Sequence, residues 1–563
     1  MKHQYVLFLL IALSLFACKK EKEKVRKLCI SEYQDKMKGA WVGQMAGVGW
    51  GLPTEFKFPD EIIPLDKVPE WDPEMINQQG NDDLYVEMTF ISSMENHWVD
   101  VSIRQAGIDF ANTGYGLWAA NKRGRDNIRS GIPPPESSHP QYSDNCDDID
   151  YQIEADFSGI LVPGMPNLAI EMGERFGRIM NYGDGLYGGQ FVGGMYTEAY
   201  FESDIEKIVQ AGLACIPEVS NYARCIRDVM TWHKEYPDDW KLTWQLIEDK
   251  YRHSLEFQGF AAQRENVWVP IDAKLNGAYI ALGLLYGNGD MDSTIVISMR
   301  AGKDSDCNPS NAAGVLATTI GFESLPKKYK TALDYSKKFS YSDYDLNKLL
   351  EVCEELSRTL IVDNGGELVR DDEYGQCWLI PEVKPVPSLF EPSYAPGPFD
   401  PDNVFSEEEL AEIKAYGSRN FKFLVEKLEI PWEIEHCGRS IKPGEITWNG
   451  KSEVFTTTPM SSERSVKLGY RGEPMLDEGE KGHLVFSAGN DSNASWKLKV
   501  VVNYKGTLDT MIESKSGPAW HQFKVPIDGT LPGGTLDIAL FASSVDGNPA
   551  VNYWADFKVE KGD

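Results

Sequence analysis

The chain has 563 residues, of which 42% are hydrophobic and 25% are charged, and this balance excludes both a disordered chain and a protein with many membrane spans. Aspartate and glutamate number 86 against 56 lysines and arginines, which gives a formal net charge of −30 at pH 7. Such a surface repels phosphate backbones and anionic lipid headgroups, so we expect no nucleic-acid partner.

The first 17 residues have the composition of an export signal. A basic start precedes an apolar run, Tyr5 to Phe16, which is too short for a permanent membrane-spanning helix. The segment that ends at Cys18 resembles the lipobox of bacterial lipoproteins, which implies that Cys18 is lipidated and becomes the N-terminus. An ordinary cleaved signal with an incidental cysteine is the alternative. We therefore expect a charged tether over residues 18–30 and a protein anchored to a bacterial membrane, in the periplasm or at the cell surface.

The other eight cysteines lie far apart, with no CxxC pair, and the eight histidines are equally scattered. These spacings indicate neither a zinc site nor a histidine-based triad. A few disulfides are possible in an oxidising compartment, but their pairing stays open.

Residues 31–345 show mainly helical periodicity with glycine-rich breaks, which predicts an all-α domain. An amphipathic run closed by Pro217 follows Ser203 to Glu206, which has the spacing of a capping box. Leu275 to Tyr286 and Ala312 to Ile320 are almost wholly apolar, which is typical of buried helices.

Residues 346–437 predict a helical and proline-rich connector, with proline and glycine crowded between 381 and 401. From 438 to 563 the hydrophobic period changes to two, which predicts a jelly-roll-like β-sandwich with carbohydrate binding as a possible role. Trp496 lies in an alternating stretch and is more typical of a core residue than of a sugar platform. The predicted strands are 465–470, 483–487, 496–504, 521–527, 536–542 and 551–559.

Two acidic clusters precede predicted helices. Asn81-Asp82-Asp83 lies at a loop-to-helix junction, where carboxylates can also serve simply as helix caps. Asp304 and Asp306 stand two residues apart, and side chains at that spacing in an extended segment point the same way. Two carboxylates held together call for a hard cation such as Mg²⁺, whereas a solvated loop is the alternative for an isolated pair.

A third cluster contains Asp144, Asp147, Asp148 and Asp150. It lacks the glycine and the closing glutamate of an EF-hand loop. We expect solvated or capping side chains there, with a second cation site as the alternative.

Glycines at 39, 43, 47 and 51 recur every four residues and would line one helix face, where another helix can pack closely. Close packing does not explain Pro53 and Glu55, which follow directly after the predicted end of this helix.

These motifs, in this order, resemble the ADP-ribosylglycohydrolase family over about residues 33 to 330. Gly39, Gly43, Gly47, Gly51, Pro53 and Glu55 match its N-terminal pattern of spaced glycines followed by P-x-E. Residues 81–84 match its T-D-D-T, residues 302–307 its G-G-D-T-D-T, and residues 313–326 the segment that follows. Gly183-Asp184-Gly185 matches its central G-N-G.

The resemblance implies a compact all-α domain with two Mg²⁺ ions. It assigns the metal ligands to Asp82, Asp83, Asp304 and Asp306, and to the positions of Asn81 and Cys307, where the family has threonines. A thiol suits Mg²⁺ poorly, so one of the two metal positions stays open, and Val48 replaces an aspartate of the family. The candidate catalytic residues are Glu55, as general base or gate, and Asp83. The candidate substrate-binding residues are Gly183, Asp184 and Gly185.

The preferred hypothesis is a magnesium-dependent hydrolase of an N- or O-glycosidic bond in an extracytoplasmic glycoside. Hydrolysis of ADP-ribose from an exported target is the first alternative, because that activity is the one the family name describes. The second alternative is a non-catalytic glycan-binding lipoprotein on a degenerate scaffold, as the replacements at 48, 81, 84 and 307 would allow.

Overall fold

The computed structural model describes residues 24–253, 257, 271–400, 402–414, 423–425, 432–435, 437–459, 465–472, 474–477, 479–490, 495–503, 505–512, 519–529, 536–544 and 551–562. The predicted signal sequence, the lipidation site at Cys18 and most of the tether lie outside the described residues. Within those ranges no helix has both the length and the apolarity that a membrane crossing requires.

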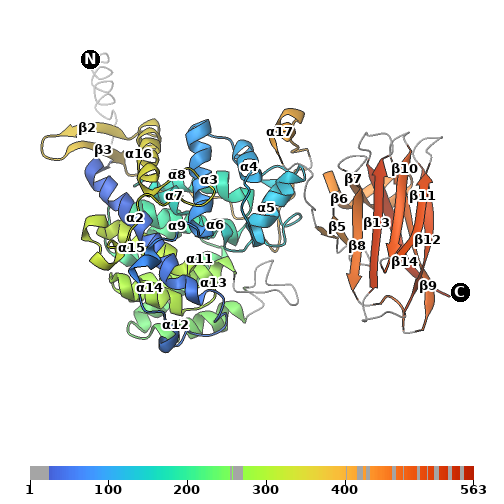
Figure 1. The fold of residues 1–563 in the computed structure, drawn as a ribbon, viewed down its shortest axis with the longest axis horizontal. Coiled ribbons are helices and arrows are strands. Elements are labelled where there is room, and N and C mark those ends of the chain that lie inside the picture. Colours follow the sequence, from blue (N-terminus) through green and yellow to red (C-terminus); the bar gives the residue numbers. More distant parts are fainter. Residues whose placement is uncertain are drawn as a thin grey trace, which may run out of the picture.

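Helices form most of the described chain up to residue 363, as expected for an all-α domain, and a β-sandwich follows (Figure 1). The apolar runs predicted as buried helices are α13 and α15. The predicted capping box is wrong, because Asp204 rather than Ser203 caps α10 and accepts a hydrogen bond from the amide of Glu206. The helices are α2 (Ile30–Gly51), α3 (Asp82–His97), α4 (Ile103–Ala111), α5 (Ala119–Arg129), α6 (Asp150–Ile153), α7 (Asp156–Ile160), α8 (Pro166–Phe176), α9 (Asp184–Ala199), α10 (Ile205–Ala214), α11 (Asn221–Glu235), α12 (Trp240–Ile247), α13 (Ala273–Gly287), α14 (Met291–Arg300), α15 (Cys307–Ile320), α16 (Leu346–Asp363) and α17 (Glu407–Glu412).

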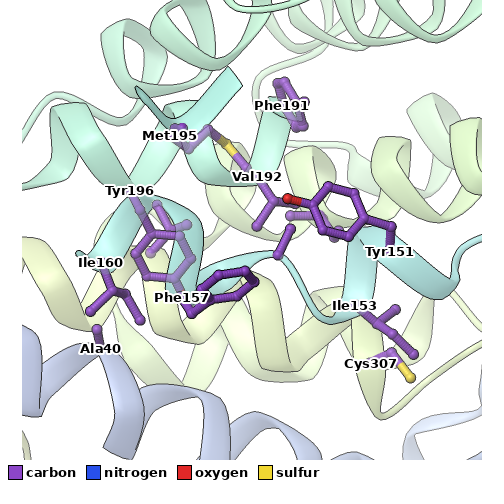
Figure 2. Packing of buried hydrophobic residues seen from close by; sticks show 14 of the residues in the cluster. Ala40, Tyr151, Ile153, Phe157, Ile160, Phe191, Val192, Met195, Tyr196 and Cys307 are labelled. Carbon is purple, nitrogen blue, oxygen red and sulfur yellow. The ribbon is translucent and has the colours of Figure 1, made fainter. Parts of the chain in front are cut away.

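The spaced glycines of α2 let this helix lie directly on α15. An ideal Cβ on Gly43 would lie 2.5 Å from the carbonyl oxygen of Ala313, and one on Gly47 would lie 2.2 Å from that of Pro309. No side chain fits at such distances, so glycine is required by the close approach of the two backbones. This contact is the centre of the domain, and around it lies one large apolar cluster, part of which is shown in Figure 2.

A small antiparallel sheet, which the sequence pattern did not predict, closes the domain at its N-terminal side. Its order is β1 (Val25–Cys29), β3 (Gly375–Pro381), β2 (Glu367–Asp371), and a disulfide joins Cys29 to Cys377 across the first pair. Helix α16 packs on α2 and α3. The first part of the segment expected as a connector, residues 346–381, therefore packs on the helical domain.

The C-terminal region is a sandwich of two antiparallel sheets, as expected. Trp496, predicted to be a core residue, is 2% exposed and packs between the sheets with Trp432 and Leu498. The strand order is β11-β10-β13-β8-β5-β4 in one sheet and β12-β9-β14-β7-β6 in the other. The strands are β4 (Phe423–Val425), β5 (Trp432–Glu435), β6 (Cys437–Trp448), β7 (Lys451–Pro459), β8 (Val466–Gly472), β9 (Lys481–Asn490), β10 (Trp496–Val502), β11 (Lys505–Ile512), β12 (Trp520–Asp528), β13 (Leu536–Ser544) and β14 (Asn552–Lys561).

Candidate metal and hydrolytic site

The N-terminus of α3 presents the first pair of carboxylates. Asn81 caps the helix by accepting a hydrogen bond of 2.9 Å from the amide of Asp83. The Asn81 Nδ2 group donates to Asp306 Oδ2 at 3.3 Å, so one side chain orients groups on both sides of the site. Asp83 is fully buried, whereas Asn81 and Asp82 are half-buried.

A tight loop before α15 presents the second pair. Gly302 and Lys303 have φ angles of +83° and +57°, which reverse the chain just before Asp304. The amide of Lys303 donates to the carbonyl of Phe58, and the amide of Phe56 donates to the carbonyl of Lys303, each at 3.3 Å. The loop that carries Asp304 is therefore pinned by the segment that directly follows Glu55.

The last glycine of α2 brings Glu55 to the site. An ideal Cβ on Gly51 would lie 2.2 Å from the carbonyl oxygen of Ser305 and 2.5 Å from the Cα of Asp306. This contact holds the turn that ends at Glu55 against the loop of the second carboxylate pair. The Thr54 and Ser305 hydroxyl groups, 2.9 Å apart, tie the same two segments together.

Asp304, Asp306 and Cys307 each offer a ligand atom, and these atoms lie within 4.8 Å of one another. All three residues are buried. The Cys307 thiol donates to Asp83 Oδ1 at 3.0 Å, which joins this group to the carboxylates of α3. Burial, and next the charges of Asp304 and Asp306, raise the pKa of Cys307 well above its usual value, so the sulfur is a protonated donor in the metal-free site.

The carboxylates oppose one another's ionisation. Burial, followed by the charges of Asp306 and Asp82, raises the pKa of Glu55 to about 7. Burial and the charge of Asp306 raise the pKa of Asp82 to about 6, and the same two causes raise the pKa values of Asp83 and Asp304 well above normal. The pKa of Asp306 is raised by burial as well. Bringing so many acids together costs free energy unless a cation balances them.

The donors of the site fit such a cation. Asp83 Oδ2 and Asp304 Oδ1 are buried and accept no hydrogen bond from the described chain. Buried carboxylate oxygens without a donor are rare, and oxygen-rich groups of this kind suit hard divalent ions. Asp82, Asp83, Asp304 and Asp306 can hold the ion, with Asn81 and Cys307 beside them.

In the third acidic cluster, the expectation of solvated side chains is wrong for Asp147, Asp148 and Asp150, which are all buried, whereas the expectation of a capping role holds for Asp150. Asp150 accepts hydrogen bonds from the amides of Ala120 and Asn121 at the start of α5. Burial, with a smaller contribution from the charge of Asp82, raises the pKa of Asp150 to about 7.

Glu154 is a further acid that the sequence reading missed. It is fully buried, and burial together with the charges of Asp150, Asp82 and Asp83 raises its pKa well above normal. Its position one helical turn beyond Asp150 was the available signal, because residues four apart share a helix face.

The predicted substrate-binding triplet lies beside this centre. Gly183, at a φ of +57°, precedes α9, and Gly185 packs against the backbone of Cys146 and Asp147. Asp184 accepts a hydrogen bond of 3.3 Å from the amide of Tyr222 and feels the charge of Lys274 at the start of α13. Two residues further along α13, Asn276 accepts a hydrogen bond of 3.4 Å from the amide of Asp304, so one helix end separates the triplet from the carboxylates.

The fold and this centre define a helical domain with a buried, oxygen-rich group of side chains that could hold a cation. The chain belongs to the ADP-ribosylglycohydrolase family, whose family model matches residues 30–360. This family is hydrolytic, and its members are typically metal-dependent.

A solved structure described as an ADP-ribosylglycohydrolase-related protein complex is 15% identical and covers 58% of this chain and 99% of its own, with a TM-score of 0.38. A structure titled for CBM4 structure and function is 12% identical and covers 24% of this chain and 90% of its own, with a TM-score of 0.17. A solved structure of a CBM28 module specific for non-crystalline cellulose is 11% identical and covers 22% of this chain and 79% of its own, also with a TM-score of 0.17. These scores are too low to carry an argument about function. No curated protein matches the chain.

Proposed function

We propose that this protein is a magnesium-dependent glycohydrolase that cleaves an N- or O-glycosidic bond of a glycoside outside the cytoplasm. The observation that carries the proposal is the convergence of Glu55, Asp82, Asp83, Asp304 and Asp306 in one centre with donor-free buried oxygens. Membership of a hydrolytic family supports the reaction class.

Asp82, Asp83, Asp304 and Asp306 would hold the cation. When bound, Mg²⁺ would supply positive charge that orients sugar hydroxyl groups and offsets the charge of the carboxylates. Asn81 keeps two of these carboxylates in place through its hydrogen bonds to the Asp83 amide and to Asp306.

Glu55 is the proposed general base. Its carboxylate is half-buried, lies close enough to Asp306 and Asp82 to feel their charges, and accepts no hydrogen bond from the described chain. It is therefore free to orient a water molecule and to take its proton while the glycosidic bond breaks through an oxocarbenium-like state. The buried surroundings limit access of other water molecules to the reacting centre.

The compartment is part of the proposal. Residues 1–17 and Cys18 have the pattern of a lipoprotein signal, so we propose a lipid anchor on a bacterial membrane, facing the periplasm or the exterior. The disulfide between Cys29 and Cys377 supports export, because such bonds persist in oxidising compartments. Removal of ADP-ribose from an exported target is the alternative activity at the same site.

Purified mature protein should be assayed against a glycan panel and an ADP-ribosylated peptide, each with Mg²⁺ and with EDTA. We expect release of sugar from a glycan that depends on Mg²⁺. We also expect Glu55→Gln to lower the turnover number at least about a hundredfold. Activity on the peptide alone would replace the substrate assignment by the alternative. Turnover that is unchanged in EDTA and in Glu55→Gln would overturn the mechanism.

A further inference from the structure

The loop between α15 and α16 places an exposed tyrosine at the rim of the carboxylate centre. The amide of Ser340 donates to the carbonyl of Gln79 at 2.8 Å, so this loop is fastened to the segment that leads into Asn81 and Asp82. Tyr341, the next residue, is 71% exposed.

Tyr341 is held in place by two buried rings. Its ring centroid lies 5.3 Å from that of Tyr85 and 5.5 Å from that of Tyr115, and these two rings lie 4.9 Å apart. Tyr85 follows Asp82 by three residues on α3, which puts both on one helix face.

The backbone of Tyr341 is strained. Its φ angle is +61°, a conformation that is costly for a residue with a bulky side chain. Neither burial nor a hydrogen bond of the side chain explains why a large aromatic ring stands in this position. An exposed aromatic ring on a strained backbone, close to the carboxylate centre, indicates a role in binding.

A second exposed aromatic residue flanks the same centre. Trp118 is 64% exposed and lies over Gly116, whose carbonyl accepts a hydrogen bond of 3.4 Å from the Tyr85 hydroxyl. The helix that begins directly after Trp118 is held by Asp150, which accepts hydrogen bonds from the amides of Ala120 and Asn121. Tyr85 and Gly116 therefore connect the two exposed rings, which come from distant loops.

We propose that Tyr341 and Trp118 form an aromatic subsite at the mouth of the carboxylate centre, and that this subsite stacks on a sugar ring adjoining the bond to be cleaved. Tyrosine and tryptophan offer flat apolar faces with polar edges, which suit the C–H face of a pyranose. A neutral sugar fits this rim better than a diphosphate, because the net charge of −30 disfavours an anionic ligand. The inference rests on the proposed function and names the substrate class for it.

The test is calorimetric binding of cellotriose, xylotriose, chitotriose and ADP-ribose to the mature protein with Mg²⁺, together with the tryptophan fluorescence of each mixture. We expect one trisaccharide to bind more tightly than ADP-ribose, and Tyr341→Ala or Trp118→Ala to weaken that binding at least tenfold. Tyr341→Phe, which keeps the ring, should stay within about threefold of the wild type. Tyr374→Ala is the matched control, because this tyrosine is 56% exposed at the turn between β2 and β3.

If the wild type and Tyr341→Ala have the same melting temperature and bind the sugar equally well, the subsite proposal is wrong. Failure of the wild type to bind any of the four probes would also overturn the subsite. Tyr341-dependent binding of ADP-ribose alone would overturn the assignment to a sugar. Glycan turnover with an unaltered KM in Tyr341→Ala would contradict the subsite but not the proposed function. Sugar binding that depends on the Tyr341 ring, without any turnover, would support the subsite and contradict the proposed function.

Discussion

The side chains of the centre are arranged for a ligand rather than for stability. Asp83 and Asp304 are buried, carry oxygens without hydrogen-bond donors, and have pKa values raised by burial and by their neighbours. When the pKa of a carboxyl group is higher in the folded than in the unfolded state, folding becomes less favourable as the pH rises from the unfolded-state pKa to the folded-state pKa. Without a cation, this centre therefore lowers the stability of the protein at neutral and alkaline pH.

This cost predicts an unusual result for Asp304→Asn at pH 8. In EDTA the melting temperature should equal or exceed that of the wild type, because one of the repelling charges is gone. The rise in melting temperature on adding Mg²⁺ should be lost, and calorimetry should show at least about tenfold weaker binding of the ion.

Asp144→Asn is the control for this prediction, since Asp144 is half-buried, with 31% of its side chain exposed, and pairs with Arg123 at 2.9 Å. It should keep the full response to Mg²⁺. A wild type that gains no stability from the ion, or an Asp304→Asn variant that gains as much, would contradict the metal assignment.

Sequence spacing predicted the two carboxylate pairs because each pair is local. Asp82-Asp83 and Asp304-Asp306 are each contained within three residues. Residue spacing could have grouped Asp150 with Glu154, but it does not show that they lie beside these pairs, because that depends on how the segment before α7 crosses the centre. The exposed ring of Tyr341 was missed for the same reason, since the hydrogen bond from Ser340 to Gln79 joins segments more than 250 positions apart.

At the scale of elements, the pairing of α2 with α15 places the site. The same glycine face that packs the helices ends at Gly51, where Glu55 meets the loop of Asp306. The glycine spacing predicted a close helix contact, and hydrophobic periodicity predicted α13 and α15 as buried helices. The partner of the glycine face could not be predicted, because residue spacing shows how close a neighbour can come but not which neighbour it is.

Gly47→Ala should weaken this pairing. The added methyl group would lie 2.2 Å from the Pro309 carbonyl oxygen, so the backbones must separate. Overpacking of this kind costs about 1–3 kcal/mol, and we expect chemical denaturation to show a loss in that range or larger. Gly114→Ala is the control, because nothing lies within 4 Å of the added Cβ. Equal stability of the two variants would contradict the close packing of α2 on α15.

At the scale of the whole molecule, the N-terminal strand ties the beginning of the described chain to a segment far along it. Cys29 and Cys377 are 348 positions apart and pair β1 with β3. Sequence patterns did not predict this sheet, because its strands are short and the pairing of β1 with β3 is not local. The sandwich was predicted from six of its strands, which show a period of two, whereas β4, β5, β6, β7 and β11 were not predicted.

Loss of this disulfide should destabilise the protein as a whole. We expect the Cys29→Ala/Cys377→Ala double variant to unfold at lower denaturant concentration, with a loss of roughly 2–5 kcal/mol. A reducing agent should produce a comparable loss in the wild type and no further loss in the double variant. A wild type whose unfolding is unaffected by reduction would contradict a structural role for the bond.

We expect the carboxylates of α3 and of the loop before α15 to bind the same cation. Anomalous diffraction from a crystal soaked in Mn²⁺, which replaces Mg²⁺ in oxygen-rich sites, tests this claim most directly. We expect an anomalous peak in contact with carboxylate oxygens of both pairs, Asp82 or Asp83 on one side and Asp304 or Asp306 on the other. A map with no peak there at saturating Mn²⁺, or with a peak bound by only one pair, would contradict it.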